Sequence, residues 1–253
     1  MMKGKPGRQL NLIIYTGGAR EWQNDYISSD ANQIWQVKGG KMVKLVGSDG
    51  NRSMVKPNTL TRFIRYCRQN FPANRYDLIM WDHGSGSSGG CGYDEKHEEE
   101  GSMSLAGINK ALDESGVKFD MIGFDACLMG TVENAAALSD NADYLLASEE
   151  SEPGDGWHYT KWIRALTKDP SLSTLRLGKL ITDDFIKRSV DYEPAVSASL
   201  SLVDRAEFSR TLPEPFAQFA AKTNGMITGK KYNHRGRQCG WPEDFGRLRG
   251  RKH

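Results

Sequence analysis

The sequence predicts an α/β fold, a three-layer sandwich in which helices cover both faces of a mostly parallel central sheet. Short apolar runs of strand length recur along the chain, at residues 10–15, 76–81, 121–124 and 143–148. Segments with apolar residues at helical spacing follow the later runs. This repeated order of strand and then helix is typical of a parallel sheet with helices on both faces.

The first third of the chain contains a strand, a hairpin and a helix. Residues 10–15 form a predicted buried strand that ends at Thr16, Gly17 and Gly18. Apolar and polar residues alternate on both sides of Gly39 and Gly40, which predicts a β-hairpin. After Pro57 an amphipathic helix is expected, whose apolar face consists of Leu60, Phe63, Ile64 and Cys67.

The second predicted strand, residues 76–81, ends at Asp82, His83 and Gly84. Residues 85–101 are rich in glycine and charge and lack apolar periodicity, so we expect a long exposed loop there. Ser104 is the expected N-cap of a helix that stops at Gly116.

The strand at residues 121–124 leads into Asp125, Ala126 and Cys127. We expect a helix to begin directly after Cys127, with an N-terminus that favours the thiolate. The remaining pattern predicts strands at 143–148 and 197–203, and helices at 131–138, 162–166, 177–190 and from the last strand to about residue 221.

Composition indicates one main domain, residues 1–222, and a basic, poorly ordered tail, residues 223–253. The net charge is +2, from 34 basic and 32 acidic side chains, so the overall charge gives no reason to expect nucleic acid as a partner. No apolar stretch is long enough to span a bilayer. The four cysteines have neither C-x-x-C nor zinc-ligand spacing, so we expect no metal site built on them.

Candidate chemistry lies at two strand ends, which parallel pairing places at one edge of the sheet. One strand ends in His83 and Gly84 and the other in Asp125, Ala126 and Cys127. A histidine can stabilise a cysteine thiolate and then protonate a leaving amine, so His83 and Cys127 form a candidate catalytic dyad. The backbone N–H groups of Gly84 and Cys127 are candidate donors to a substrate oxyanion.

Each of these residues also has a simpler interpretation. A single cysteine at a strand end is commonly an inert core residue, and a histidine before glycine is commonly a turn residue. Their occurrence together, each after an apolar strand and before small residues, favours the dyad.

Three motifs resemble one family. WDHGSG, FDACLMG and ASEESEPGDGW, in this order and spacing, are similar to the clostripain family of cysteine peptidases, in the same clan as caspases, gingipains and legumains. The resemblance covers roughly residues 10–204. It implies a caspase-like sandwich, a dyad of His83 and Cys127, and cleavage after Arg or Lys. It also implies secretion or a cell-envelope location, although the chain shows no signal peptide, and it implies no required cofactor.

The resemblance assigns the acidic residues that select a cationic P1 side chain to Asp125 and Asp155. Strand periodicity supports Asp125, because it places this residue on the same side as Cys127. The alternative is that Asp125 caps the following helix and that Asp155 is a turn residue.

Family members are often activated by self-cleavage between the histidine and cysteine motifs, and here Lys96 offers a P1 residue of the right type. We therefore expect cleavage between Lys96 and His97. The same segment carries Asp94, Glu95, Glu98, Glu99 and Glu100 without EF-hand spacing. Calcium is accordingly expected at most as a modulator.

Beyond residue 204 the sequence departs from the family, which suggests a peptidase domain truncated at its C-terminus. A non-catalytic, peptidase-like binding module therefore stays an alternative. A receiver-like domain, in which Asp125 would accept a phosphoryl group, is a weaker alternative. It would need acidic residues after the first strand to hold magnesium, and this chain has Tyr15, Thr16, Gly17 and Gly18 there. We expect a monomer that acts on protein or peptide substrates.

Overall fold

The computed structural model describes residues 1–192 and 198–228. The chain divides into two compact units, residues 1–206 and residues 207–253. All of the predicted site residues lie in the first unit.

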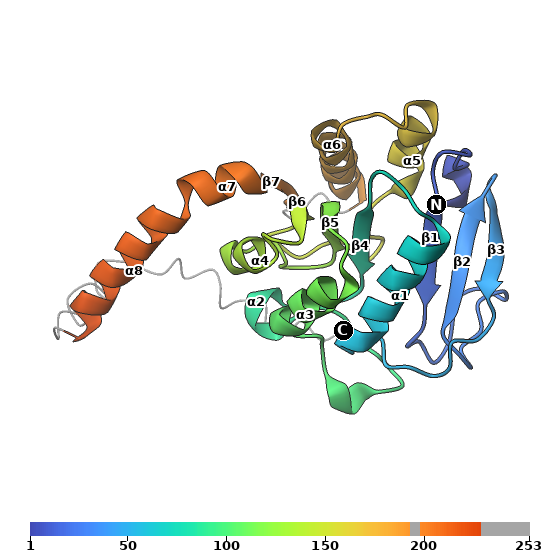
Figure 1. Cartoon of the computed structure of the whole chain (residues 1–253), viewed down its shortest axis with the longest axis horizontal. Coiled ribbons are helices and arrows are strands. Elements are labelled where there is room, and N and C mark those ends of the chain that lie inside the picture. The colour runs from blue at the N-terminus through green and yellow to red at the C-terminus, as the bar shows by residue number, and fades with distance from the viewer. Residues whose placement is uncertain (193–197, 229–253) are drawn as a thin grey trace, which may run out of the picture. The chain divides into compact units, whose positions relative to one another are not determined.

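The first unit contains a four-stranded sheet in the order β4-β5-β6-β7 (Figure 1). Its strands are β4 (Asp77–Trp81), β5 (Phe119–Asp125), β6 (Ala142–Ala147) and β7 (Ser201–Asp204). The first three strands run parallel, whereas β7 pairs antiparallel with β6. The predicted mostly parallel sheet is thus confirmed, with an antiparallel strand at one edge.

The N-terminal strands form a separate antiparallel sheet of β1 (Leu12–Thr16), β2 (Gln33–Lys38) and β3 (Lys41–Val46). The predicted hairpin is confirmed: Gly39 and Gly40 form its turn with φ angles of 57° and 82°, which favour glycine. The first strand was expected to be buried, but most side chains of β1 are only half-buried. It pairs with β2 across the full strand length.

Two helices, α1 (Pro57–Asn70) and α3 (Leu105–Ser115), pack against each other. The Thr61 hydroxyl donates to the carbonyl of Ala111 at 3.1 Å and so joins the two helices. Ser104 caps α3 by accepting the N–H of Gly107, and Gly116 ends the helix with a φ of 66°. The predicted bounds of α3 are therefore confirmed.

Helices α5 (Tyr159–Lys168) and α6 (Thr174–Tyr192) pack with the sheet in one hydrophobic core. Strand β5 contributes Met121 to this core, and a Cβ on Gly123 would come within 2.9 Å of the Trp157 ring. Because side chains alternate along a strand, Asp125 belongs to the same face as Met121 and Gly123. The alternation therefore directs the Asp125 carboxyl toward Trp157.

The helix predicted at residues 131–138 is confirmed as α4 (Val132–Ala137), which Thr131 caps, but the expectation that a helix begins directly after Cys127 is wrong. The intervening chain instead pairs with the segment that follows β6. Leu128, with a φ of 64°, donates its N–H to the Glu150 carbonyl at 3.0 Å, and Gly130 donates to Ser148 at 2.7 Å. These contacts hold the turn out of helical geometry.

The glycine-rich segment at residues 85–101, expected to be an exposed loop, is partly buried. It contains the short helices α2 (Gly86–Gly89) and η2 (Glu98–Glu100). Between them Cys91 bridges both Gly84 and Met103 in strand-like pairs, and its side chain is buried. Single bridges of this kind leave no periodic pattern in a sequence, which explains the wrong prediction.

The second unit contains most of α7 (Arg205–Thr211), which begins in the first unit, and α8 (Pro213–Thr228). Helix α8 extends beyond residue 222, where the tail was expected to begin. The basic residues from position 230 onward and Cys239 lie outside the described residues, so the expected disorder stays a prediction. Among residues 1–192 and 198–228, no helix is long and apolar enough to cross a membrane.

Candidate active site

His83 and Cys127 lie at adjoining ends of β4 and β5. The parallel register pairs Trp81 with Asp125, so the chain positions two residues further on are His83 and Cys127. Gly84 brings the two strand extensions very close: a Cβ at this position would lie 2.1 Å from the carbonyl oxygen of Cys127. Only glycine allows this approach without a shift of the backbone.

The backbone on both sides of the histidine is fixed, while its ring is exposed. The His83 N–H donates to Asp82 Oδ1 at 2.6 Å, and the His83 carbonyl accepts the N–H of Gly92 at 2.8 Å. The imidazole meets the Tyr93 ring edge to face, with centroids 6.3 Å apart. The loop thus holds the ring near the surface at the edge of the sheet.

The Cys127 thiol contacts the backbone of Glu152. The Glu152 N–H donates to Sγ at 3.2 Å, and Sγ lies 3.9 Å from the Glu152 carbonyl oxygen. Within the described residues, no hydrogen bond joins Sγ to the His83 ring. The thiol is half-buried and contacts the segment that follows β6.

The other two described cysteines are Cys67, which is half-buried, and Cys91, which is buried. Burial raises the pKa of both Cys67 and Cys91 to about 12, so these thiols stay protonated and unreactive near neutral pH. Cys91 lies in the glycine-rich segment, where its backbone pairs with Gly84 and Met103, and Cys67 lies on α1.

The two N–H groups expected to bind an oxyanion are free of protein partners. Neither the N–H of Gly84 nor that of Cys127 donates to an acceptor among the residues that the structure describes. Both belong to the adjoining strand extensions, where Gly84 meets the Cys127 carbonyl. Their role as donors to a substrate oxyanion stays a prediction.

The two acidic residues expected in a P1 pocket have different surroundings. Asp125 is 3% exposed and accepts the Trp157 N–H at 2.9 Å and the Tyr159 hydroxyl at 2.6 Å. Asp155 is exposed in the turn that the Gly156 N–H closes on the Pro153 carbonyl at 2.9 Å. Asp155 therefore does not share the immediate environment of Asp125.

A third acidic residue, Glu152, was missed by the sequence analysis. Its Oε1 accepts the Trp157 indole N–H at 3.3 Å, and its carboxyl is in hydrogen-bond contact with that of Asp125. Burial, and next the charge of Asp125, raise the pKa of Glu152 to about 9. Its position in the acidic turn motif was the available signal, but the sequence does not show which carboxylate of that turn faces inward.

Lys96 and His97 lie in a tight turn built on Asp94. The buried Asp94 Oδ1 accepts the N–H groups of Lys96 at 2.9 Å and His97 at 3.1 Å, and contacts His97 Nδ1 at 3.1 Å. Burial opposes the ionised form of Asp94, but the hydrogen bonds from Met54, His97 and Lys96 outweigh it and lower the pKa. The Lys96 ammonium also contacts the Ser29 carbonyl.

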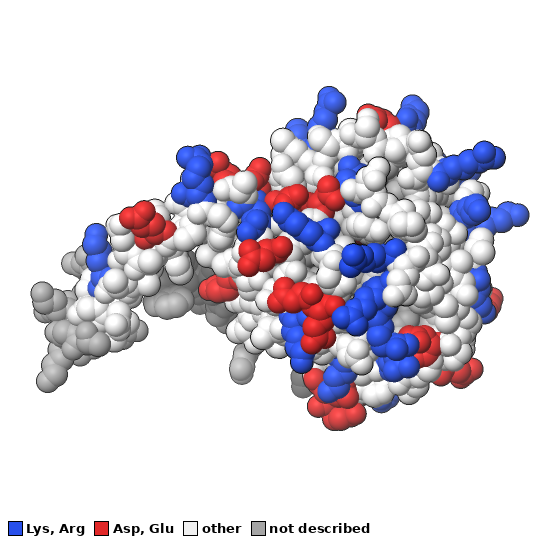
Figure 2. All heavy atoms as spheres, in the orientation of Figure 1, with Lys and Arg blue, Asp and Glu red and all other residues white. Residues whose placement is uncertain are grey.

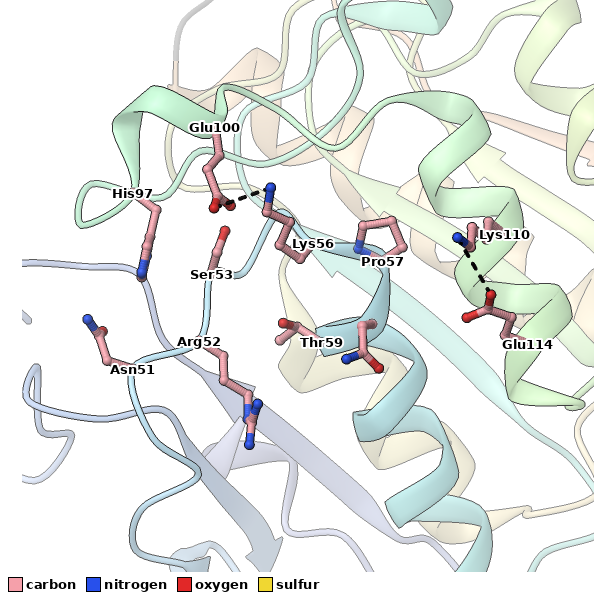
Figure 3. Close-up of a pocket in the computed structure, with 11 residues that line it drawn as sticks. Asn51, Arg52, Ser53, Lys56, Pro57, Thr59, His97, Glu100, Lys110 and Glu114 are labelled. Atoms are coloured by element: carbon pink, nitrogen blue, oxygen red, sulfur yellow. Dashed lines mark ion pairs between the residues drawn. The ribbon is translucent and has the colours of Figure 1, made fainter.

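A cavity of about 600 Å³ borders this turn and lies away from the dyad. Figure 3 shows Lys56 paired with Glu100, and Lys110 paired with Glu114, among its lining side chains. Since its cations are largely balanced by these carboxylates, the cavity has no strong charge preference. On the face of the molecule in Figure 2, basic and acidic side chains are likewise interspersed.

The acidic side chains of the 94–100 segment have separate protein partners. Glu95 accepts the Arg20 N–H at 2.7 Å, Glu98 pairs with the Arg20 guanidinium at 2.8 Å, and Glu100 pairs with Lys56 at 3.2 Å. In the described part of the chain, no group of three or more His, Cys, Asp or Glu side chains is arranged to hold a metal ion.

The fold and the two strand ends define a caspase-like α/β protein with a candidate cysteine and histidine pair. A model of the clostripain family matches residues 1–222, and the chain belongs to this family. It is 33% identical over 187 residues to the clostripain of Hathewaya histolytica, a match that covers 62% of this chain and 36% of that protein.

Solved structures share the fold. A secreted C11 cysteine protease from Bacteroides thetaiotaomicron is similar with a TM-score of 0.62 and 18% identity, over 79% of this chain and 57% of that one. An inactive zymogen C11 protease from Parabacteroides distasonis is similar with a TM-score of 0.61 and 22% identity, over 83% and 55% of the two chains. The chain thus spans about a third of the clostripain and just over half of these solved chains.

Proposed function

We propose that this chain is a cysteine endopeptidase that cleaves after Arg or Lys, with Cys127 as the nucleophile and His83 as its acid and base. The observation that carries this proposal is the strand register, which pairs Trp81 with Asp125 and thereby aligns the two residues. Family membership supports the same class of reaction. Because the Glu152 N–H donates to Cys127 Sγ at 3.2 Å, the thiol must turn away from the Glu152 backbone to engage the imidazole.

In the proposed reaction the Cys127 thiolate attacks the carbonyl carbon of the scissile bond. The N–H groups of Gly84 and Cys127 receive the developing oxyanion, and the His83 imidazolium protonates the leaving amine. His83 then takes a proton from a water molecule as that water attacks the thioester carbon. Breaking the C–S bond releases the carboxyl product and regenerates the Cys127 thiolate and the His83 imidazolium. We assign selection of the cationic P1 side chain to Asp125 and, at the pocket rim, to Asp155.

Fluorogenic peptides with Arg, Lys, Asp or Asn at P1 test this function. We expect hydrolysis of the Arg and Lys peptides only, and its loss in both Cys127→Ala and His83→Ala. Activity that survives in Cys127→Ala would overturn the assignment of the nucleophile. A wild-type protein that binds these peptides without hydrolysing them would favour the non-catalytic binding module.

We also propose that the enzyme cleaves its own chain between Lys96 and His97. The bond lies in a turn closed by Asp94, so this segment must open before it can enter an active site in an extended conformation. Mass spectrometry of the intact protein tests the proposal. We expect two fragments that meet at this bond in the wild type and a single chain in Cys127→Ala.

Two further expectations belong to the same proposal. The related protease of known structure is described as secreted, and we propose a secreted or cell-envelope location for this chain. Calcium is proposed only as a modulator, with no part in the chemistry of Cys127. Measuring the hydrolysis of the Arg peptide with calcium and with a chelator distinguishes a modulator from a required ion.

A further inference from the structure

Glu152 lies between the nucleophile and the buried carboxyl of Asp125. Its backbone N–H contacts Cys127 Sγ at 3.2 Å. Its side chain reaches the other way, to the Trp157 indole N–H at 3.3 Å and to Asp125. Glu152 is half-buried while Asp125 is 3% exposed, so a side chain that enters beside Cys127 meets Glu152 first.

Ionising both carboxyls would place two negative charges in contact in a buried environment, which costs free energy. Within the described residues, Glu152 Oε2 is buried and has no hydrogen-bond donor. A proton on Glu152 removes this defect, because the resulting O–H can donate to Asp125. Two carboxyls in contact, sheltered from water, share one proton in the same way.

The neighbouring groups locate this proton on Glu152. Those packed against it are the Asp125 carboxyl, the Tyr159 phenol and the Cys127 thiol. Asp125 accepts two further hydrogen bonds, from the Trp157 N–H and the Tyr159 hydroxyl, which favour its ionised form. Burial, and next the charge of Asp125, raise the pKa of Tyr159 well above its ordinary range, so the phenol keeps its proton.

We propose that Glu152 is a specificity-determining residue of the P1 pocket, and that its carboxyl releases a proton to solvent when a cationic P1 side chain binds. The inference rests on the proposed cleavage after Arg or Lys. Before binding, the carboxyl pair carries one proton and one negative charge. With the cation bound, the pair carries two negative charges, and the guanidinium or ammonium replaces the lost proton as the partner of Glu152.

This exchange makes recognition of a P1 cation depend on pH. A ligand that displaces one proton gains at most tenfold in affinity for each unit of rising pH, until the group is ionised in the free protein. An uncharged P1 side chain displaces no proton and gains nothing. The ratio of kcat/KM for two peptides that differ only in arginine or citrulline at P1 isolates the effect, because the titration of His83 and Cys127 cancels.

The experiment measures this ratio from pH 6 to pH 9 for the wild type and three variants. Glu152→Gln removes the exchangeable proton, Glu152→Asp keeps a carboxyl, and Glu150→Gln is a matched control on an exposed residue of the same segment. We expect the ratio to rise several-fold per pH unit in the wild type, in Glu150→Gln and in Glu152→Asp. In Glu152→Gln we expect a ratio that does not change with pH.

Two results would overturn the role of Glu152 while leaving the proposed function intact. One is a wild-type enzyme that cleaves the arginine peptide with a pH-independent ratio. The other is a Glu152→Gln enzyme whose ratio rises as in the wild type. A wild type that cleaves neither peptide overturns the proposed function and this inference together. A folded, inactive Glu152→Gln beside an active Glu152→Asp with a rising ratio supports the need for a carboxyl.

Discussion

At the scale of single residues, the alignment of His83 with Cys127 depends on the absence of a side chain at Gly84. A Cβ there would lie 2.1 Å from the Cys127 carbonyl oxygen, which is a backbone atom and cannot swing aside. The same residue carries one of the two unpartnered N–H groups at the strand ends. Its size therefore matters both to packing and to the proposed oxyanion contact.

We predict that Gly84→Ala lowers kcat/KM at least a hundredfold and costs about 1–3 kcal/mol of stability, because the strand extensions must separate. Peptide hydrolysis and urea unfolding measure the two effects. Gly154→Ala is the control, since no atom lies within 4 Å of a Cβ placed there. A Gly84→Ala enzyme as stable and active as the control would contradict the close approach.

A second residue-scale prediction concerns the stability of the folded chain against pH. The pKa of Glu152 is about 9 in the folded protein against an ordinary value of 4.5. Between these values the unfolded chain has lost this proton and the folded chain keeps it, so the free energy of unfolding falls as pH rises. The contribution is fully present below pH 4.5 and is lost as pH rises to 9.

Glu152→Gln should remove this part of the pH dependence. We predict that the variant gains stability relative to the wild type as pH rises from 5 to 9, as measured by urea unfolding at each pH. Glu150→Gln should follow the wild-type curve. A constant difference between Glu152→Gln and the wild type would mean that Glu152 carries no extra proton in the folded protein.

At the scale of elements, the segment between the two motifs is held by one buried carboxylate. Asp94 accepts N–H groups from Lys96 and His97 within the segment and the N–H of Met54 outside it, at 2.8 Å. This single side chain therefore fixes the turn that contains the proposed cleavage bond and docks it on the chain before α1.

We predict that Asp94→Asn weakens this segment by about 1–3 kcal/mol, because it replaces a charged acceptor of several N–H groups. In a Cys127→Ala background, which would prevent the proposed self-cleavage, added trypsin should cut after Lys96 several-fold faster. Glu99→Gln in the same background is the matched control, since Glu99 is exposed. Equal rates of cleavage in both variants would exclude Asp94 as the anchor.

The elements differ in how much of them the sequence could predict. Helix α3 was predictable at both ends, because a capping serine and a left-handed glycine act through local chemistry. The non-helical turn between Cys127 and Thr131 was not, because Leu128 and Gly130 bond to the distant Glu150 and Ser148. Nor was the burial of the glycine-rich segment, which depends on single bridges between Cys91 and its two partners.

At the scale of the whole molecule, the mostly parallel sheet followed from the order of apolar strands and helical segments. That sheet sets the register between β4 and β5, so the adjacency of the two strand ends was also predictable. The identity of the second inward-facing carboxylate, Glu152, was not predictable. Asp125 followed from strand alternation, but the choice between Glu152 and Asp155 depends on the path of an irregular turn around Trp157.

The central claim is that Cys127 is a nucleophile activated by His83. A peptidyl acyloxymethyl ketone with Arg at P1 tests it most directly, because the reagent forms a thioether with the attacking sulfur as its carboxylate leaves. Peptide mapping by mass spectrometry after labelling identifies the sulfur. We predict an adduct on Cys127 in the wild type and at least hundredfold slower labelling in His83→Ala. Labelling of Cys67 or Cys91 in place of Cys127, or an unchanged rate in His83→Ala, would contradict the claim.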